Sequence, residues 1–232
     1  GVQIHHLLSQ SSGISRAAAM RAYAVATGEA SAEAARLHSE SGLIFEPGSQ
    51  WPGLTSSDFL LLGLIIESAS GQPYADFLAD TIFTPLGMNN TALTNDTTNM
   101  ALGYRPGDSQ PQEPDYLVGR YAGEGLSSTI EDMTLFSQAL LAGNLLSPES
   151  MALMLNRAVV MSTGWHTGYG WFMSDFDGRF FSASMPSLGI TGYNGAMVIL
   201  PEEDLAWVIL SNDSSQAQGY GGDTLTLMVL DE

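Results

Sequence analysis

The chain has 232 residues, of which 44% are apolar and 14% charged, a composition typical of a globular chain that can bury a core. Its formal net charge of -18 comes from 25 acidic residues against 7 Arg and no Lys, which argues against nucleic acid and anionic membrane as partners because both attract cationic surfaces. The absence of Cys excludes disulfides and thiolate chemistry, and the longest apolar run, residues 59–66, is too short to insert across a membrane.

The first two thirds of the chain predict helices and one long loop. Five stretches combine a helix-forming composition with capping residues or a terminal Gly, namely residues 15–36, 59–69, 73–82, 128–141 and a helix that begins at Ser147. The 128–141 helix has the clearest start, because Ser128 and Glu131 have the spacing of a capping box. Pro85 is expected to end the third helix, and three Pro residues predict a loop over residues 89–118.

From Tyr169 onward the pattern changes to that of antiparallel strands. Four short apolar stretches predict strands that pair as two hairpins, namely residues 169–174 with 179–184 and residues 195–200 with 205–211. Helices followed by strands indicate an α+β fold. We therefore expect one domain over residues 1–232, with a mainly helical region over 15–168 and an antiparallel sheet region over 169–232. Residues 225–230 are expected to pack on that sheet.

Five short blocks resemble one known family in their order and approximate spacing. They are Ile4-His5-His6-Leu7-Leu8-Ser9-Gln10-Ser11-Ser12-Gly13, Phe45-Glu46-Pro47-Gly48, Pro85-Leu86-Gly87-Met88, Ala122-Gly123-Glu124-Gly125-Leu126-Ser127-Ser128-Thr129 and Gly189-Ile190-Thr191-Gly192-Tyr193-Asn194-Gly195. Together they resemble the serine beta-lactamases and penicillin-binding-protein-like hydrolases, including the class C and esterase branches. The resemblance implies the beta-lactamase/transpeptidase-like fold, a helical region plus an antiparallel sheet flanked by helices. The first block lies in mid-fold in that family, so we expect the N-terminal part of the fold to be missing.

The resemblance also implies a Ser nucleophile in a Ser-x-x-Lys element, where the Lys eases removal of the Ser proton. In the family that element lies upstream of the first block. The 232 residues contain no Lys, so none of their Ser residues can belong to such an element. We therefore expect the chemistry of this chain either to be lost or to depend on a separate N-terminal segment.

A second element of the family, Tyr-x-Asn, is degenerate here. Leu54, Thr55 and Ser56 stand at its position, counted back from Gly63. The resemblance assigns the Tyr phenol a role in proton transfer and the Asn amide a role in holding substrate. Leu cannot exchange a proton, so the general base that the resemblance implies is absent from this position.

The third element, Lys-Thr-Gly or His-Thr-Gly on an inner strand, is only partly retained. Ile190 stands at its polar first position, so the electrostatic role of that residue is lost. Thr191 and Gly192 are retained, and with the N–H of Tyr193 they are expected to bind an extended ligand. His166 opens a literal His-Thr-Gly triplet, but this triplet does not precede the expected strand, and we interpret it as a coincidence in a loop.

These observations leave two functions open. The first is a beta-lactamase-related protein that is catalytically degenerate in this chain and keeps a binding or assembly role. The second is the C-terminal part of an active serine hydrolase, of the esterase, beta-lactamase or D-amino-acid peptidase type, completed by an N-terminal companion segment or protein partner. Neither requires a cofactor, a metal, nucleic acid or membrane insertion. An oligomer is compatible with both, and the resemblance favours a periplasmic or secreted location.

Overall fold

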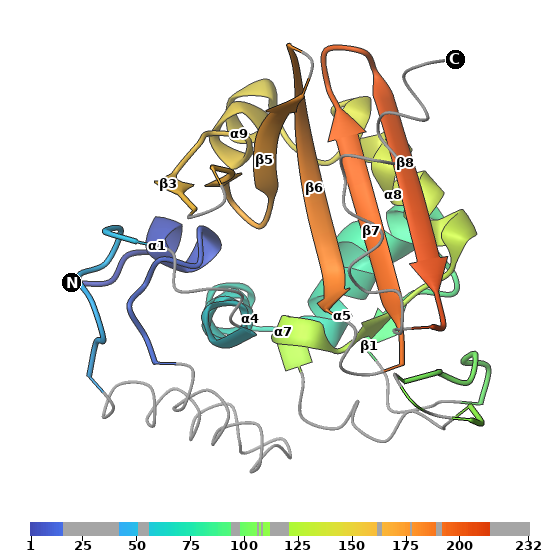
Figure 1. Ribbon diagram of the computed structural model, residues 1–232. Coiled ribbons are helices and arrows are strands. Elements are labelled where there is room, and N and C mark those ends of the chain that lie inside the picture. The colour runs from blue at the N-terminus through green and yellow to red at the C-terminus, as the bar shows by residue number, and fades with distance from the viewer. Residues whose placement is uncertain are drawn as a thin grey trace.

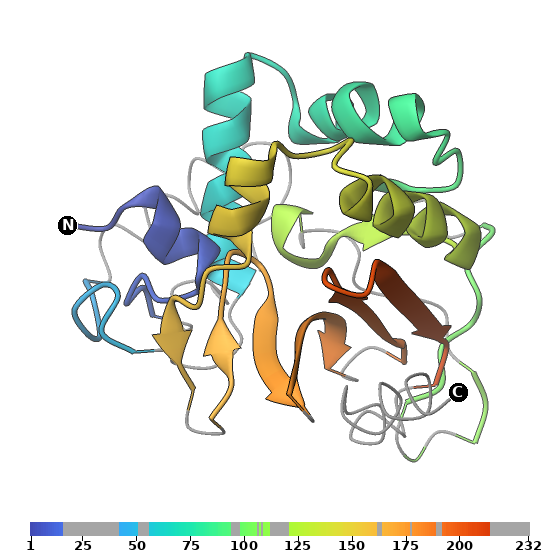
Figure 2. The same cartoon turned by 90° about the horizontal axis from the view of Figure 1, so that it is seen from above.

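The computed structural model describes residues 1–15, 42–50, 56–93, 98–105, 107, 109–111, 121–161, 164–176, 178–188 and 192–213. In this part of the chain one antiparallel sheet packs against a layer of helices (Figure 1 and Figure 2), which confirms the predicted α+β fold. None of the helices that the structure describes is long and apolar enough to span a lipid bilayer.

The helices agree in most places with the sequence pattern. Those described are α1 (Ile4–Leu8), α4 (Ser56–Ser70), α5 (Tyr74–Leu78), the π-helix η1 (Ala79–Phe83), α6 (Thr84–Leu86), α7 (Tyr121–Glu124), α8 (Ile130–Leu141) and α9 (Pro148–Met154). The predicted helices over residues 59–69 and 128–141 correspond to α4 and α8. Ser147 caps α9 as predicted, because its hydroxyl accepts the N–H of Ser150 at 3.2 Å. All but the first residue of the helix predicted over 15–36 lies outside the described residues, and α1 was not predicted.

The end of the helical segment before Gly87 differs from the prediction. Pro85 is predicted to stop the helix, but α5, η1 and α6 follow one another without a break and end at Leu86. Pro85 lies in the first turn of α6, directly after the π-helix η1, so the position that lacks an N–H coincides with the change of helix type. Gly87 then ends the segment with a left-handed φ of 74°.

The start of α8 is displaced by one residue from the prediction. Thr129, and not Ser128, is the N-cap residue, and its hydroxyl accepts the N–H of Asp132 at 3.3 Å. Ser128 instead forms a hydrogen bond with the Thr91 hydroxyl at 2.7 Å. The capping-box spacing therefore locates the helix but assigns the cap to the wrong hydroxyl, because a partner from a distant part of the chain engages Ser128.

The main sheet has six antiparallel strands in the order β3-β4-β5-β6-β7-β8. They are β3 (Val159–Val160), β4 (His166–Thr167), β5 (Phe172–Phe176), β6 (Arg179–Leu188), β7 (Asn194–Leu200) and β8 (Leu205–Ser211), and a separate pair is formed by β1 (Ala92–Leu93) and β2 (Leu126–Ser127). The two predicted hairpins are confirmed. His166 and Thr167, predicted to lie in a loop, form β4 and pair with strands on both sides. The sheet thus begins at Val159, earlier than the predicted boundary at residue 169.

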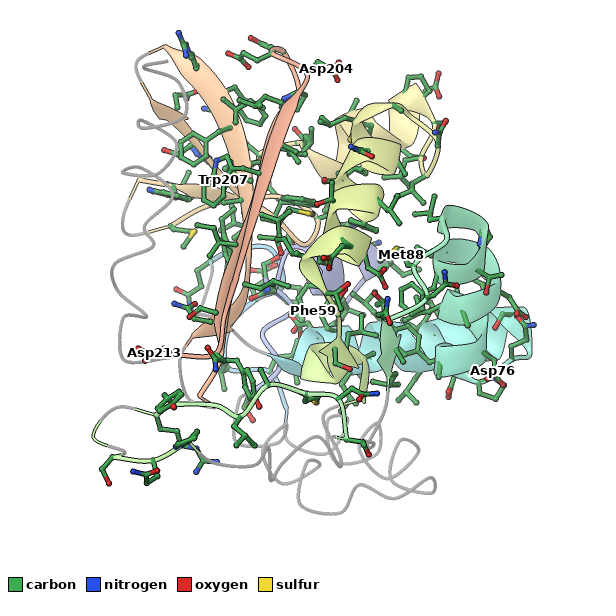
Figure 3. The ribbon with its side chains drawn as sticks, turned by 90° about the vertical axis from the view of Figure 1, so that its right-hand side faces the viewer. Phe59, Asp76, Met88, Asp204, Trp207 and Asp213 are labelled. Carbon is green, nitrogen blue, oxygen red and sulfur yellow. The ribbon has the colours of Figure 1, made fainter. Side chains whose placement is uncertain are left out.

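The two faces of the sheet carry separate apolar clusters. The cluster on the helix-covered face contains Leu140 of α8, Trp171, and Met197 and Ile199 of β7. The other cluster is built from strand residues and their connections, with Phe181, Ala183, Val198 and Leu200 at its centre. Trp207 belongs to it and projects from β8 away from α8 (Figure 3). All seven residues of β7 are buried, as expected for a central strand with both faces covered.

Residues 8–14, which we call the junction segment, join several separate parts of the chain. The carbonyls of Leu8, Ser11 and Gly13 accept the N–H groups of Gly170, Gly48 and Ile44 at 2.9, 2.8 and 2.8 Å, respectively. The Ser12 hydroxyl donates to Oδ1 of Asp58 in α4 at 2.6 Å. Gly13 has a φ of 78°, and a Cβ added there would lie 2.3 Å from the Phe45 carbonyl oxygen. No other residue type fits at Gly13 without moving the backbone.

The substitution Gly13→Ala is therefore expected to destabilise the fold far more than Gly71→Ala. Gly71 has a similar φ of 73° and no atom within 4 Å of an added Cβ, so it isolates the conformational penalty of about 1–2 kcal/mol. Gly13→Ala adds a backbone clash, and we expect a total loss of about 3–5 kcal/mol in the free energy of unfolding. Urea denaturation followed by Trp fluorescence measures both variants. Equal losses in the two variants would show that the backbone around Gly13 moves to accommodate the added Cβ without a further loss of stability.

Candidate functional site

The structure describes only part of the predicted site. Leu54, Thr55, Ile190 and Thr191 lie outside the described residues. Ser56 is the first residue of α4, so the degenerate Tyr-x-Asn position leads directly into this helix. Gly192 and Tyr193 are described, and they lie at the end of the sheet from which β7 starts.

Gly192 and Tyr193 do not lie on a strand, which differs from the prediction. β6 ends at Leu188 and β7 begins at Asn194, so both residues belong to the connection between these strands. Gly192 has a φ of 86°, a left-handed conformation that interrupts an extended backbone. The inner strand that precedes this connection is β6.

The connection is held in place by residues 101–104. The Tyr193 hydroxyl donates to the Ala101 carbonyl, and the backbone around Gly103 approaches Gly192 so closely that a Cβ added to Gly103 would lie 3.0 Å from the Gly192 carbonyl oxygen. Asn212, just after β8, also holds residues 101–104 in place. Its side-chain amide donates to the Leu102 carbonyl at 2.9 Å, and its own carbonyl accepts the Tyr104 N–H at 2.7 Å. Since the Gly192 backbone packs against residues 101–104, a ligand needs a different edge nearby.

Such an edge is present on the second half of β6. β5 pairs with β6 only as far as Ala183, whereas β6 continues to Leu188 and pairs with β7 from Ser182 to Leu188. Residues 184–188 therefore have a strand partner on one side only among the described residues. A shift in register between Ser184 and Ser187 marks an irregularity in this overhang, which contains Pro186. The overhang leads directly to the Gly192–Tyr193 connection.

The sequence prediction of the second hairpin strand stops at Ser184 and so misses this overhang. The residues after Ser184 show no alternation of apolar and polar side chains, and Pro186 argues against a central strand. The only signal that could have extended the prediction is the distance to β7: a tight hairpin needs two to five connecting residues, whereas ten separate Ser184 from Gly195.

Asp58, the residue directly before the predicted helix over residues 59–69, is a fully buried carboxyl group. Its exposed fraction is 0%, and its Oδ1 accepts the hydroxyl of Ser12, which is itself only 2% exposed. Its Oδ2 is buried and has no hydrogen-bond partner among the described residues. Burial raises the pKa of Asp58 from 3.8 to about 6, although the hydrogen bonds from Ser12 act to lower it. An acidic residue directly before an apolar helix was the signal available in the sequence.

A second buried carboxylate, Asp132, belongs to a network that is structural. Its Oδ2 accepts the Asn90 N–H at 2.8 Å and the Thr91 hydroxyl at 2.7 Å. The Thr91 hydroxyl in turn pairs with Ser128 at 2.7 Å. These bonds tie the chain before β1 to the first turn of α8. Among the described residues, Ser128 forms hydrogen bonds with Thr91 and the Thr129 carbonyl, and neither is a basic group that could remove its proton.

Comparison with known proteins identifies close similarities over nearly the whole chain. A family model described as Beta-lactamase matches residues 1–228. The chain is 28% identical over 247 residues to penicillin-binding protein 4* of Bacillus subtilis (strain 168), covering 94% of this chain and 53% of that protein. It is 25% identical over 182 residues to a D-aminopeptidase of Gluconobacter oxydans (strain 621H), covering 76% of this chain and 34% of that protein.

Solved structures show the same fold. An octameric penicillin-binding protein homologue from Pyrococcus abyssi superposes with a TM-score of 0.84 at 25% identity, over 100% of this chain and 56% of that chain. A penicillin-binding protein from Bacillus halodurans gives a TM-score of 0.80 at 24% identity, over 99% and 72% of the two chains. The chain spans about half the length of the first curated relatives it matches. Because the family model matches residues 1–228 and the fold agrees, the chain belongs to the beta-lactamase family.

Proposed function

We propose that this chain is a beta-lactamase-family protein that does not catalyse hydrolysis by itself and instead binds an extended peptide along β6. The overhang of β6 over residues 184–188 is the observation that carries this proposal. A strand edge without a neighbour presents backbone N–H and C=O groups that an added strand can pair with. The overhang adjoins the connection that contains Gly192 and Tyr193, where the sequence predicts ligand contacts.

The overhang supports a moderate rather than a tight interaction. Pro186 has no N–H, so at this position a ligand strand can pair only with a carbonyl. Residues 101–104 hold the adjoining connection through Tyr193 and Gly192, which keeps the end of the overhang in a defined place. A preorganised edge binds with less loss of conformational entropy than a mobile one.

Three positions argue against hydrolysis by these 232 residues alone. The chain has no Lys, so the Ser-x-x-Lys element has no place in it. Leu54 and Ile190 stand where the family resemblance places a proton-transferring Tyr and a polar Lys or His. Loss of one member of such a catalytic unit typically costs on the order of a thousandfold or more in rate. Three losses together are hard to offset.

The relatives suggest a class of ligand. They include a D-aminopeptidase and putative D-alanyl-D-alanine carboxypeptidases. We infer that the peptide bound at the overhang ends in D-amino acids. A net charge of -18 further favours a ligand that is neutral or cationic over one that is strongly anionic.

A peptide ending in D-Ala-D-Ala is therefore expected to perturb the backbone amides of β6 residues 184–188 in NMR titration. The shifts should be concentrated there and at Tyr193, because these residues flank the open edge. We expect a dissociation constant in the range of about 10 μM to 1 mM, as for small interfaces with few hydrogen bonds.

Two matched peptides serve as controls for this titration. The same peptide with N-methylated backbone amides keeps its side chains but loses the donors that strand pairing requires, so it should not bind. The L-Ala-L-Ala peptide tests the stereochemical preference. Equal shifts with the N-methylated peptide, or shifts confined to other strands, would contradict binding along β6.

A second candidate function is a serine hydrolase in which this chain is completed by an N-terminal companion segment. It is favoured by the extent of the match, because the Bacillus subtilis relative has about half of its length outside the matched region. The companion would supply the Ser and Lys that these residues lack. For both proposed functions, we expect a periplasmic or secreted location by analogy with the penicillin-binding relatives. Assembly into oligomers is proposed by analogy with the octameric Pyrococcus abyssi homologue.

Labelling of native material with a fluorophosphonate or penicillin probe, followed by intact mass measurement, separates the two functions. We expect the 232 residues alone to take up no label, because no Lys activates a Ser in them. A labelled companion fragment that co-purifies with this chain would establish the second function. Label on a Ser of these 232 residues would overturn both proposals.

A further inference from the structure

The Ser12–Asp58 pair is a buried contact between two parts of the chain that are far apart in sequence. The Ser12 hydroxyl donates to Oδ1 of Asp58 at 2.6 Å and accepts the N–H of Ile14 at 3.0 Å. Asp58 is the third residue of α4, whereas Ser12 belongs to the junction segment. The pair is therefore the side-chain link between the first turn of α4 and the junction segment.

The same segment carries several other long-range contacts over only a few residues. The carbonyl of Ser11 accepts the N–H of Gly48, and the carbonyl of Gly13 accepts the N–H of Ile44, both at 2.8 Å. These carbonyls flank Ser12 directly. Ser12 is therefore connected to residues 44–48 through the hydrogen bonds of its two neighbours, and not through the sheet.

Asp58 is poorly suited to carry a charge in this place. It is 0% exposed, and its buried Oδ2 has no hydrogen-bond partner among the described residues. Titratable residues on α4 and on the elements around its first turns are His5, His6, Glu67, Tyr121, Glu124 and Tyr169. The pKa of Asp58 is raised by burial, and the hydrogen bonds from Ser12 act to lower it. A carboxyl in such a site prefers its neutral form.

We propose that Ser12 and Asp58 form an acid-closed latch, which fastens the junction segment to α4 when Asp58 is neutral and loosens it when Asp58 is ionised. The neutral carboxyl keeps the Ser12 hydrogen bond without leaving a charge in an apolar site. Ionisation leaves a buried carboxylate with one oxygen unpaired, and opening of the segment lets water reach that oxygen. The latch is independent of the ligand proposed for β6.

The direction of the pH effect follows from linkage. The closed form has a pKa of about 6 at Asp58, and the open, hydrated form has the ordinary value of 3.8. Below about pH 4 both forms are protonated, and the free-energy difference that favours the closed form is largest. This difference decreases as the pH rises to about 6, and the opening equilibrium constant should increase on the order of a hundredfold over this range.

Hydrogen exchange at the amides of Ile14, Ile44 and Gly48 between pH 4 and pH 8 tests the latch. After correction for intrinsic exchange, we expect the logarithm of their protection to fall between about pH 4 and pH 6, with a midpoint of about pH 5, and to level off above pH 6, while the amides of β7 keep theirs. Asp58→Asn should make the protection independent of pH. Asp76→Asn is the matched control, because Asp76 is also the third residue of its helix, α5, but is exposed (Figure 3); it should leave the wild-type profile unchanged.

Ser12→Ala provides a second variant that does not change the titrating group. Because the hydrogen bonds from Ser12 lower the pKa of Asp58, their loss should move the midpoint to higher pH. Flat wild-type protection, an unchanged profile in Asp58→Asn, or an unchanged midpoint in Ser12→Ala would each overturn the latch. So would an equal loss of protection in β7, since that would report destabilisation of the whole fold.

Discussion

The hydrogen bonds of the junction segment determine where the N-terminal part of this chain meets the rest. Within seven residues, three carbonyls and the Ser12 hydroxyl engage three separate parts of the chain, at Gly170, at Ile44 and Gly48, and at Asp58. The bonds at Gly170, Gly48, Ile44 and Asp58 are 2.9, 2.8, 2.8 and 2.6 Å long, and none is an ion pair at the surface. The position of the first turn of α4, the helix that directly follows the degenerate Tyr-x-Asn position in the sequence, depends on the hydrogen bond from Ser12 to Asp58.

The other half of the candidate site is positioned by unequal strand lengths. β5 is five residues long and β6 ten, so β6 extends beyond its neighbour on one side. β7 and β8 pair over their whole lengths, which anchors the far side of the overhang. Asn212 and Tyr193 then hold residues 101–104 against the end of these strands. In the described part of the chain, a strand edge without a partner next to a fixed connection is thus a consequence of the sheet and needs no catalytic residue.

Sequence patterns predicted the elements whose signals are local. The cap at Ser147, the apolar helix α4 and the hairpin of β7 and β8 depend on neighbouring residues only, and they were predicted correctly. The prediction failed where a distant partner decides the outcome. Ser128 pairs with Thr91 and leaves the cap to Thr129, and the short stretch at His166 becomes a strand because β3 and β5 pair with it. Burial of Asp58 depends on the junction segment, which no local pattern in α4 reveals.

The positions at which the sequence departs from the family motifs are different from the residues that hold the described fold together. The fold is held by fully buried residues such as Val198 and Ile199 of β7, and by the backbone bonds of the junction segment. The degenerate positions instead lie where elements begin or connect, directly before α4 and between β6 and β7. Replacing a polar catalytic residue by Leu or Ile at such a position removes a reacting group without opening a cavity in the core. The proposed binding edge instead depends on the lengths of β5 and β6, because β5 pairs with β6 only as far as Ala183. The binding role proposed for residues 184–188 therefore does not require the residues that the family motifs place at the catalytic positions.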